Sequence, residues 1–358
     1  MRFSVVIPVH KPAWFQLTLP SILHQSMSSS KYEIIIVDDC GGRANSMLMQ
    51  FQDQLAQYPW RYVLCGDGCG QATARNRGLA LATGEIVLFL DDDMLASPDL
   101  LETHDSYHQR EFSVVMGGSP HRALTIWYPN WFNSLSGGGR KAILESGHPR
   151  LLSYIDYQPE DIMITLITIL QPYDIVHDFG QVRQLAFTRE HHLSALFGDE
   201  LTDLAIPWIT GGAGNLSVQR KLLEVVGGFD ENFHGWGLED LELEYRLHHA
   251  GARFAFITRV TAYHQLHPRQ WEAMLKSNLR NYKYFCQKHP SPTVFLFFQY
   301  KMRQLPIQVY NEIAKQEQKG QLKPQEIEAA ERAYQQLVTM DEEALISQVL
   351  AMAKGQWP

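Results

Sequence analysis

Long uninterrupted apolar runs are missing from this 358-residue sequence. No stretch reaches the roughly 18 apolar residues that indicate a membrane-spanning helix. The most apolar patch, residues 293–298, is short and soon meets Lys301 and Arg303, which favours a core or interface helix over one lying on a membrane. The N-terminus also lacks the charged and apolar regions of a secretory signal. We therefore expect a cytoplasmic protein and leave peripheral membrane contact open.

Cysteine and positive charge are also scarce. The four cysteines, at positions 40, 65, 69 and 286, match neither paired metal-site spacing nor a disulfide framework, so we predict free thiols in a reducing compartment. Lys and Arg number 31 against 39 Asp and Glu, a net charge of −8. This deficit argues against a general nucleic-acid binder, which neutralises phosphates with basic side chains. The negative net charge still allows a local basic pocket that binds a small phosphate.

Core-forming residues are abundant, since 45% of the residues are hydrophobic, and the apolar runs recur regularly along the chain. Runs typical of buried strands alternate with segments of helical propensity. The strands are expected at 4–9, 32–37, 60–64, 86–90 and 112–116, and the helices at 14–23 with a break or kink at Pro20, 45–57, 71–82 and 99–110. Continuous apolar strands separated by helices predict an α/β fold with a mostly parallel sheet covered on both faces.

Acidic residues cluster where two of these strands end. Asp91, Asp92 and Asp93 follow the strand 86–90, and Asp38-Asp39 ends the strand 32–37. Open α/β sheets bind ligands at the carboxyl ends of their strands, so both clusters should lie on one rim. Carboxylates there suit Mg²⁺ or Mn²⁺ carrying a diphosphate. A solvated acidic loop or a helix cap is the alternative interpretation.

A basic segment lies between the two acid clusters. Residues 70–78 pass from a loop into a helix N-terminus, whose free amides favour anions. Arg75 or Arg77 could hold a phosphate there or pair with the acids. Both arginines could equally be solvated on an early helical turn.

The second half of the chain carries further acids and histidines. Glu239 and Asp240 open a predicted helix, either as chemical groups or as caps that the helix dipole stabilises. The preceding Trp236 stands between two glycines and offers a flat apolar plate suited to a sugar ring. After the strand-like run 254–257 comes His264, a candidate third metal ligand that we prefer over His267.

Two regions carry fewer signals. Residues 119–207 lose the alternation, and we expect an insertion with its own helices, carrying a mobile lid. From 271 onward the sequence is helical, with helices predicted at 271–288, 293–318 and 324–354, a break at Pro306 and a pause near 339–341. These C-terminal helices indicate a scaffold, a packing arm or an oligomerisation element.

The ordered motifs resemble the inverting family-2 glycosyltransferases with the GT-A fold. The resemblance spans residues 1–268, and its Gly-Trp-Gly-x-Glu-Asp element resembles the acceptor-side motif of galactosyl- and N-acetylgalactosaminyltransferases. The motifs are Val5-Val6-Ile7-Pro8, Glu33 to Asp39, Ala74-Arg75-Asn76-x-Gly78, Gly84-Glu85 through Asp93, Gly228-Phe229-Asp230, Gly235-Trp236-Gly237-x-Glu239-Asp240 and Tyr263-His264.

The resemblance implies a role for each matching residue. Asp240 would be the general base, and Glu239 and Trp236 would bind the acceptor. The metal would be held by Asp91, Asp93 and His264. The nucleotide would contact Pro8, His10, Asp39, Arg75 and Asp92.

We therefore expect a metal-dependent, inverting transfer of a hexose or N-acetylhexosamine from a nucleotide-diphosphate donor, with a UDP-sugar as the expected donor, to a glycan or other hydroxyl acceptor. The cofactor would be Mn²⁺ or Mg²⁺. A nucleotidyltransferase, or a glycan- or nucleotide-binding module without catalysis, are the alternatives. The expected parts are a catalytic domain at 1–268, divided into a nucleotide half at 1–118, an insertion or lid at 119–207 and an acceptor half at 208–268, and a helical extension at 269–358. Homo-oligomerisation through that extension stays open.

Overall fold

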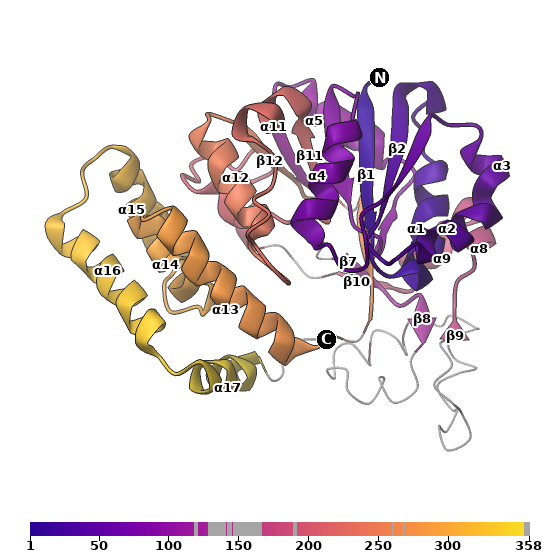
Figure 1. Cartoon of the computed structure of the whole chain (residues 1–358). Coiled ribbons are helices and arrows are strands. Elements are labelled where there is room, and N and C mark those ends of the chain that lie inside the picture. Colours follow the sequence, from indigo (N-terminus) through magenta and orange to yellow (C-terminus); the bar gives the residue numbers. More distant parts are fainter. Residues whose placement is uncertain are drawn as a thin grey trace, which may run out of the picture.

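A seven-stranded sheet forms the centre of the protein (Figure 1). The computed structural model describes residues 1–117, 121–127, 141, 145, 167–188, 192–259, 261–267 and 269–353. The strands of the sheet lie in the order β12-β6-β11-β4-β1-β2-β3. Their bounds are β1 (Phe3–Val9), β2 (Tyr32–Asp38), β3 (Trp60–Leu64), β4 (Ile86–Leu90), β6 (Val114–Gly117), β11 (Asn215–Gln219) and β12 (Phe254–Ile257).

This sheet is mostly parallel, which confirms the predicted α/β fold. β1 pairs in parallel with β2 and β4, β2 with β3, and β12 with β6. The strand β11 runs antiparallel to both β4 and β6. It was not predicted, because it directly follows a glycine-rich segment with the composition of a loop. Its register pairs Asn215 with Leu90 and so brings the glycine-rich segment beside the aspartates.

Alternate residues of the central strands point into two separate cores, as the period of two in a strand requires. Val6 lies in the core that includes α4 (Gln71–Leu81) and α12 (Glu239–His249). Its neighbours Val5 and Ile7 lie in the core that includes α1 (Pro12–Leu23) and α5 (Leu100–His108). The sheet is therefore covered on both faces, and its polar groups of interest can emerge only at the strand ends.

Two helix predictions near the N-terminus were wrong in detail. The helix α1 continues through Pro20, so the break that was one of the two expected outcomes is absent, and its buried face, including Phe15 and Leu19, lies in the core. The segment predicted as one helix at 45–57 instead forms α2 (Arg43–Leu48), a 3₁₀ turn and α3 (Gln52–Leu55). The tighter turn lies where Phe51 enters the core.

A second sheet, in the order β10-β7-β13-β5, adjoins the carboxyl end of β4. Its strands are β5 (Met94–Ala96), β7 (His121–Ala123), β10 (Ala186–Thr188) and β13 (Ala262–Gln265). β13 runs antiparallel to β5 and pairs His264 with Met94. That register places the histidine next to the aspartates that precede β5.

The predicted insertion at 119–207 is described in part. It contains the short pair β8 (Ile126–Trp127) and β9 (Ile167–Thr168), the helices α8 (Pro172–His177), α9 (Gly180–Gln184) and α10 (His192–Phe197), and, at its boundary with the next segment, the 3₁₀ turn Pro207–Thr210. The segment is thus helical in part, as expected. The glycine-rich 136–139, the aromatic pair at 131–132 and most of the apolar segment 162–170, which the mobile-lid prediction concerned, lie outside the described residues.

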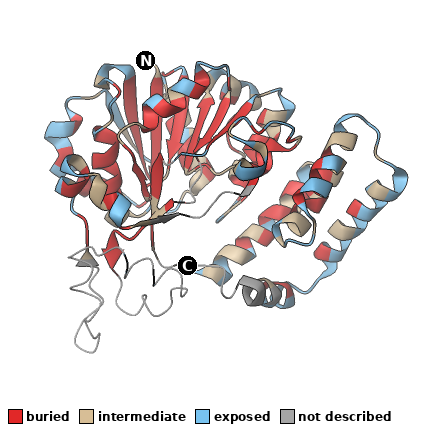
Figure 2. Cartoon of the chain, turned by 180° about the vertical axis from the view of Figure 1, so that it is seen from behind, coloured by how far each residue is buried: buried red, intermediate tan, exposed pale blue. Residues whose placement is uncertain are grey.

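In the described part of residues 269–358, five helices follow β13 and lie beside α12, away from β1 to β3 (Figure 1). They are α13 (Trp271–Lys288), α14 (Pro292–Lys301), α15 (Ile307–Gln318), α16 (Pro324–Thr339) and α17 (Glu342–Ala353). The predicted break at Pro306 and the pause near 340 are confirmed. Figure 2 shows buried residues in the strands and on the inner sides of these helices. None of the helices in the described part of the chain has the length and apolarity needed to cross a membrane.

A buried polar cluster joins α5 to β11 and makes stability depend on pH. His104 lies 2.8 Å through Nδ1 from the Ser217 hydroxyl, and His108 lies 2.7 Å through Nε2 from the same hydroxyl. Burial lowers the pKa of His104 to about 3 and that of His108 to about 4. In the unfolded chain both imidazoles titrate near 6.5. Below that pH the unfolded state binds more protons than the folded state. The folded protein therefore loses stability as the pH is lowered.

We expect the free energy of unfolding to decrease between pH 6.5 and 4 by up to about 1.4 kcal/mol per pH unit for each imidazole. Urea titrations at several pH values measure this slope. The variant His104→Gln should show a shallower slope whatever its absolute stability, whereas His24→Gln, at an exposed position, should keep the wild-type slope. Equal slopes for wild type and His104→Gln would contradict the assignment.

Candidate active site

The two acid clusters lie on one rim of the sheet. Asp91 directly follows β4 and Asp39 directly follows β2, and both strands flank β1 in parallel. The prediction that the clusters share a rim is therefore confirmed. The side chains have separate surroundings, and these suggest separate duties.

Asp93 forms a compact group with two histidines. Its Oδ2 lies 3.5 Å from His264 Nε2 and 3.1 Å from His267 Nε2. Its Oδ1 is buried without a hydrogen-bond partner in the described part of the protein. Burial alone would raise the pKa of Asp93, but the two imidazoles outweigh it and hold that pKa well below its usual range. The carboxylate is thus negative and has an unused oxygen.

This group fits a divalent metal ion. One ligand atom from each of Asp93, His264 and His267 lies within 4.8 Å of the others. Burial lowers the pKa of His264 to about 4, so its ring stays neutral and keeps a lone pair for a ligand. The sequence favoured only His264. His267 also lies beside Asp93, a contact that residue spacing alone does not reveal.

Arg75 lies at the centre of the acids and is 2% exposed. Its Nη2 donates to Asp91 Oδ1 and its Nη1 donates to Glu239 Oε1, each at 2.9 Å. The guanidinium thus pairs with the acids, one of the roles that the sequence left open, whereas Arg77 two residues later is exposed. Burial and Asp240 raise the pKa of Glu239 to about 7 against the effect of Arg75.

Asp92 points toward the backbone of the β1–α1 connection. Its Oδ2 accepts hydrogen bonds from the amides of His10 at 2.8 Å and Lys11 at 2.6 Å. Burial and the charge of Asp93 raise the pKa of Asp92 to about 8. The side chain therefore ties the connection that carries His10 to the acid cluster.

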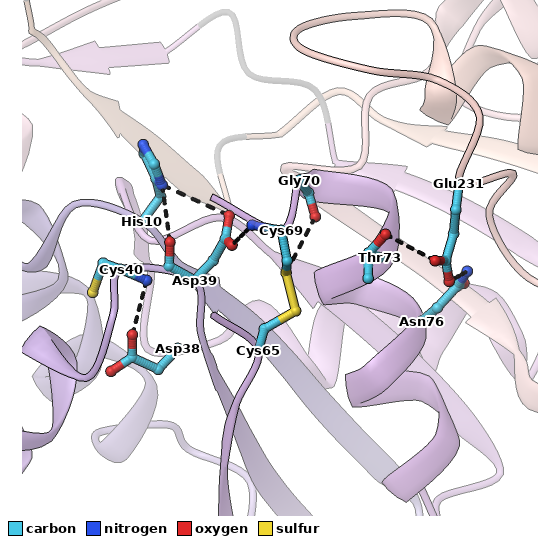
Figure 3. The surroundings of a disulfide bond; sticks show 10 residues. All are labelled: His10, Asp38, Asp39, Cys40, Cys65, Cys69, Gly70, Thr73, Asn76 and Glu231. Atoms are coloured by element: carbon cyan, nitrogen blue, oxygen red, sulfur yellow. Dashed lines mark hydrogen bonds and ion pairs between the residues drawn. A yellow bond between two sulfur atoms is a disulfide. The ribbon is translucent and has the colours of Figure 1, made fainter. Parts of the chain in front are cut away.

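Asp39 lies at the opposite end of the rim, below His10 (Figure 3). Its Oδ1 accepts the amide hydrogen of Cys69, and its Oδ2 lies 3.7 Å from His10 Nδ1. The adjacent Asp38 accepts the amide hydrogens of residues 40, 42 and 44 and so fixes the turn after β2. The predicted partner Pro8 is a buried residue within β1.

A disulfide joins Cys65 to Cys69 beside Asp39 (Figure 3). The prediction that all four cysteines are free thiols was therefore wrong for this pair. Gly66 and Gly68 take φ values of 144° and 77°, which L side chains rarely adopt, and the resulting turn brings the two cysteine Cα atoms to 6.1 Å. Spacing alone does not reveal such a turn. The cysteines at 40 and 286 are free and buried.

A glycine-rich loop, residues 211–214, packs against three carboxyl groups one after another. A Cβ at Gly211 would lie 1.5 Å from Glu244 Oε2, and one at Gly214 would lie 2.9 Å from Asp91 Oδ2. Between them, the Ala213 amide donates to Asp240 Oδ2 at 3.2 Å. Glycine is required here because side chains would collide with the acids.

Glu244 was not singled out from the sequence. It is fully buried one helical turn after Asp240, and neither carboxyl oxygen has a hydrogen-bond partner among the described residues. Burial and the charge of Asp240 raise the pKa of Glu244 well above its usual range, which favours the protonated form of this carboxyl group. Its i, i+4 spacing from Asp240 was visible in the sequence, but its burial was not.

The helix α13 holds the loop that carries Trp236. Ser277 Oγ accepts the amide hydrogen of Trp236 at 3.1 Å, and Asn281 Nδ2 donates to the carbonyl of Gly237 at 2.8 Å. Trp236 itself is 41% exposed. The C-terminal helices thus help to shape the predicted acceptor side.

Two of the recognised motifs hold the architecture together. Asn76 bonds to Phe229 in both directions, accepting its amide hydrogen at 2.8 Å and donating to its carbonyl at 2.9 Å. Asp230 accepts from Lys288 Nζ at 2.6 Å and from the Tyr284 hydroxyl at 2.9 Å, both on α13. These contacts join α4 and α13 to the segment that precedes α12.

Comparison with known proteins agrees with this arrangement. Residues 4–152 match the model of glycosyl transferase family 2, and residues 199–268 match the model described as the N-terminal domain of galactosyltransferase. A mannosyltransferase from Pyrobaculum calidifontis, solved with GDP-Man and Mn²⁺, superposes with a TM-score of 0.50 at 16% identity, over 98% of this chain and 80% of that one. The protein has the GT-A fold of glycosyltransferases.

Relatives in sequence are also glycosyltransferases. The glycosyltransferase YfnE of Bacillus subtilis is 26% identical over 302 residues, 81% of this chain and 71% of the relative. The validoxylamine A glucosyltransferase of Streptomyces hygroscopicus subsp. limoneus is 28% identical over 298 residues, 82% of this chain and 58% of the relative. The chain thus spans little more than half of the second enzyme.

Proposed function

We propose that this glycosyltransferase is metal-dependent and inverting, and that it moves a hexose or N-acetylhexosamine from a UDP-sugar to a hydroxyl of a glycan or other acceptor. The observation that carries the proposal is the glycine-rich loop 211–214. The Ala213 amide of this loop donates to Asp240 Oδ2, Gly214 lies against Asp91, and Asp93 with its two histidines lies two residues beyond Asp91. The base and the metal site that we propose would thus lie close to one backbone segment.

The donor would lie along the rim from Asp39 to Asp93. We assign Asp39 to the base of the nucleotide, with His10 and Pro8 around it, and the metal to Asp91, Asp93, His264 and the added His267. Arg75 and Asp92 would act indirectly. Arg75 would orient Asp91, whereas Asp92 would fix the amides of residues 10 and 11. A bound divalent ion would neutralise charge on the leaving diphosphate.

The acceptor would approach from the side of Trp236 and Asp240. Trp236 provides an exposed aromatic face for a sugar ring, and Glu239 is assigned to the acceptor because its Oε2 has no hydrogen-bond partner in the described structure. Asp240 would take the proton from the acceptor hydroxyl while its oxygen attacks the anomeric carbon opposite the leaving diphosphate. One in-line displacement inverts that carbon and needs no covalent intermediate.

The choice of metal follows from the ligands. Two imidazoles beside carboxylates suit a transition ion such as Mn²⁺ better than Mg²⁺, which prefers oxygen ligands. We therefore propose Mn²⁺ as the preferred cofactor. Turnover with Mg²⁺ that equals turnover with Mn²⁺ would argue against ligation by both histidines.

The deciding experiment is a screen of nucleotide sugars with Mn²⁺, with Mg²⁺ and with EDTA, in which released nucleoside diphosphate is measured with and without sugar acceptors. The proposal expects metal-dependent, acceptor-stimulated release of UDP. Release of pyrophosphate would favour a nucleotidyltransferase instead. UDP-sugar binding without turnover across a broad acceptor panel would favour a binding module.

The disulfide provides a prediction about donor affinity. Reduction frees the loop 65–69, whose Gly68 and Cys69 amides bind the Asp39 carbonyl and carboxylate. We expect UDP affinity to fall by about 3- to 10-fold, since ordering a freed loop costs on the order of 1 kcal/mol. Calorimetry on the oxidised and the reduced protein measures this change.

The double variant Cys65→Ser/Cys69→Ser is the matched control. It should bind UDP like the reduced wild type and should not respond to reductant. An oxidised and a reduced wild type with the same UDP affinity would show that the disulfide does not shape the base pocket.

A further inference from the structure

Arg269 occupies a position that a metal ion would need. It lies between β13 and α13, and its Nη2 is 2.9 Å from His264 Nε2. A guanidinium only donates hydrogen bonds, so the ring nitrogen must accept through its lone pair. The same nitrogen is the one that faces Asp93 Oδ2 at 3.5 Å. Arg269 and a metal ion would therefore compete for one lone pair.

The tautomer of His264 agrees with this competition. Because Nε2 accepts a hydrogen bond, the ring proton of the neutral imidazole resides on Nδ1. That Nδ1 is buried and has no partner among the described residues. The ring is thus oriented with its acceptor nitrogen toward the acids and toward Arg269, the form that a metal ligand requires.

Charge explains why the guanidinium rests there. Arg269 is surrounded by the negative charge of Asp93 and Asp91, which oppose the lowering of its pKa by burial. Both acids are also the proposed metal ligands. The guanidinium therefore provides part of the positive charge that these carboxylates need.

Binding of a divalent ion would reverse this preference. The ion would take the His264 lone pair and repel the guanidinium, which would need a new anion. The anion that the ion carries, the diphosphate of the donor, is the nearest candidate, and a guanidinium binds phosphate oxygens in a bidentate manner. Trp271, whose ring lies 5.6 Å from the guanidinium carbon, gives the side chain an aromatic surface outside the lone-pair position.

We propose that Arg269 is the resident cation of the metal site and that it moves from His264 to the donor diphosphate when the metal and nucleotide bind. This inference rests on the proposed function. Arg269 would then weaken the binding of the metal ion alone and strengthen the binding of the nucleotide together with the metal.

The test compares wild type with Arg269→Met, which keeps an unbranched apolar stem and removes the charged guanidinium. Free Mn²⁺ is counted by electron paramagnetic resonance without nucleotide, and UDP binding is then measured by calorimetry in saturating Mn²⁺. We expect Arg269→Met to bind Mn²⁺ about 5-fold or more tightly than wild type and to bind UDP about 5-fold or more weakly. The control Arg332→Met, at an exposed position on α16, should match wild type in both assays.

Each outcome decides between the alternatives. Equal or weaker Mn²⁺ binding by Arg269→Met, or unchanged UDP binding, overturns the inference while the proposed function stands. Absence of Mn²⁺ binding in wild type and variant overturns the metal dependence of the proposed function itself. Arg269→Lys should restore part of the competition but not the bidentate contact, so its Mn²⁺ affinity should lie near that of wild type while its UDP affinity stays reduced.

Discussion

Replacing Asp240 by Asn is expected to lower kcat by about 10²- to 10⁴-fold, the usual contribution of a positioned general base. An amide cannot take the proton of the acceptor hydroxyl, yet it has nearly the size of the carboxylate. Donor binding depends on other residues, so UDP affinity in Mn²⁺ should stay close to that of wild type. Turnover of a UDP-sugar with a saturating acceptor measures the loss.

Two controls test whether a loss of activity has another cause. Asp240 Oδ2 accepts the Ala213 amide hydrogen, so the variant could disturb the glycine-rich loop 211–214. Retained Mn²⁺–UDP binding and an unchanged unfolding midpoint exclude that explanation. Asp53→Asn, at an exposed position on α3, should leave turnover unaffected. Full activity of a folded Asp240→Asn protein would remove Asp240 from the role of base.

Replacing Arg75 by Met is expected to destabilise the protein by about 3–5 kcal/mol, the usual cost of removing one partner of a buried ion pair. The side chain is 2% exposed and bridges Asp91 and Glu239, so its removal leaves two carboxyl groups without their counter-charge. Urea titration at neutral pH measures the loss. Activity should also fall, since Asp91 loses the donor that orients it.

Arg77→Met is the matched control because Arg77 lies on the same helix and is exposed. Its stability should stay within about 0.5 kcal/mol of wild type, as for most surface substitutions. Arg75→Lys should recover part of the loss, because a single ammonium cannot serve both carboxylates with the geometry of a guanidinium. Similar stabilities of Arg75→Met and Arg77→Met would contradict the bridging role.

Features that depend on neighbouring residues along the chain could be predicted from the sequence. The apolar runs that form β1, β2 and β4 follow the pattern of buried parallel strands, and the acids at their ends had to meet on one rim because parallel strands share their direction. The break at Pro306 followed from local chemistry in the same way. At Pro20 the same local rule failed, because core packing kept the helix α1 intact.

Burial and contacts that form only when the chain folds were decided by the tertiary structure. The sequence could not distinguish Arg75 from Arg77, since burial depends on which face of α4 meets the sheet. It could not bring His267 to Asp93, close the turn that joins Cys65 to Cys69, or bury Glu244 beneath Gly211. The contacts of His267 and Glu244 depend on packing over long separations in the chain, and the disulfide depends on backbone angles at Gly66 and Gly68 that the spacing does not reveal. The sequence alone thus determined which residue types gather at the rim, and the tertiary structure determined which atoms face one another.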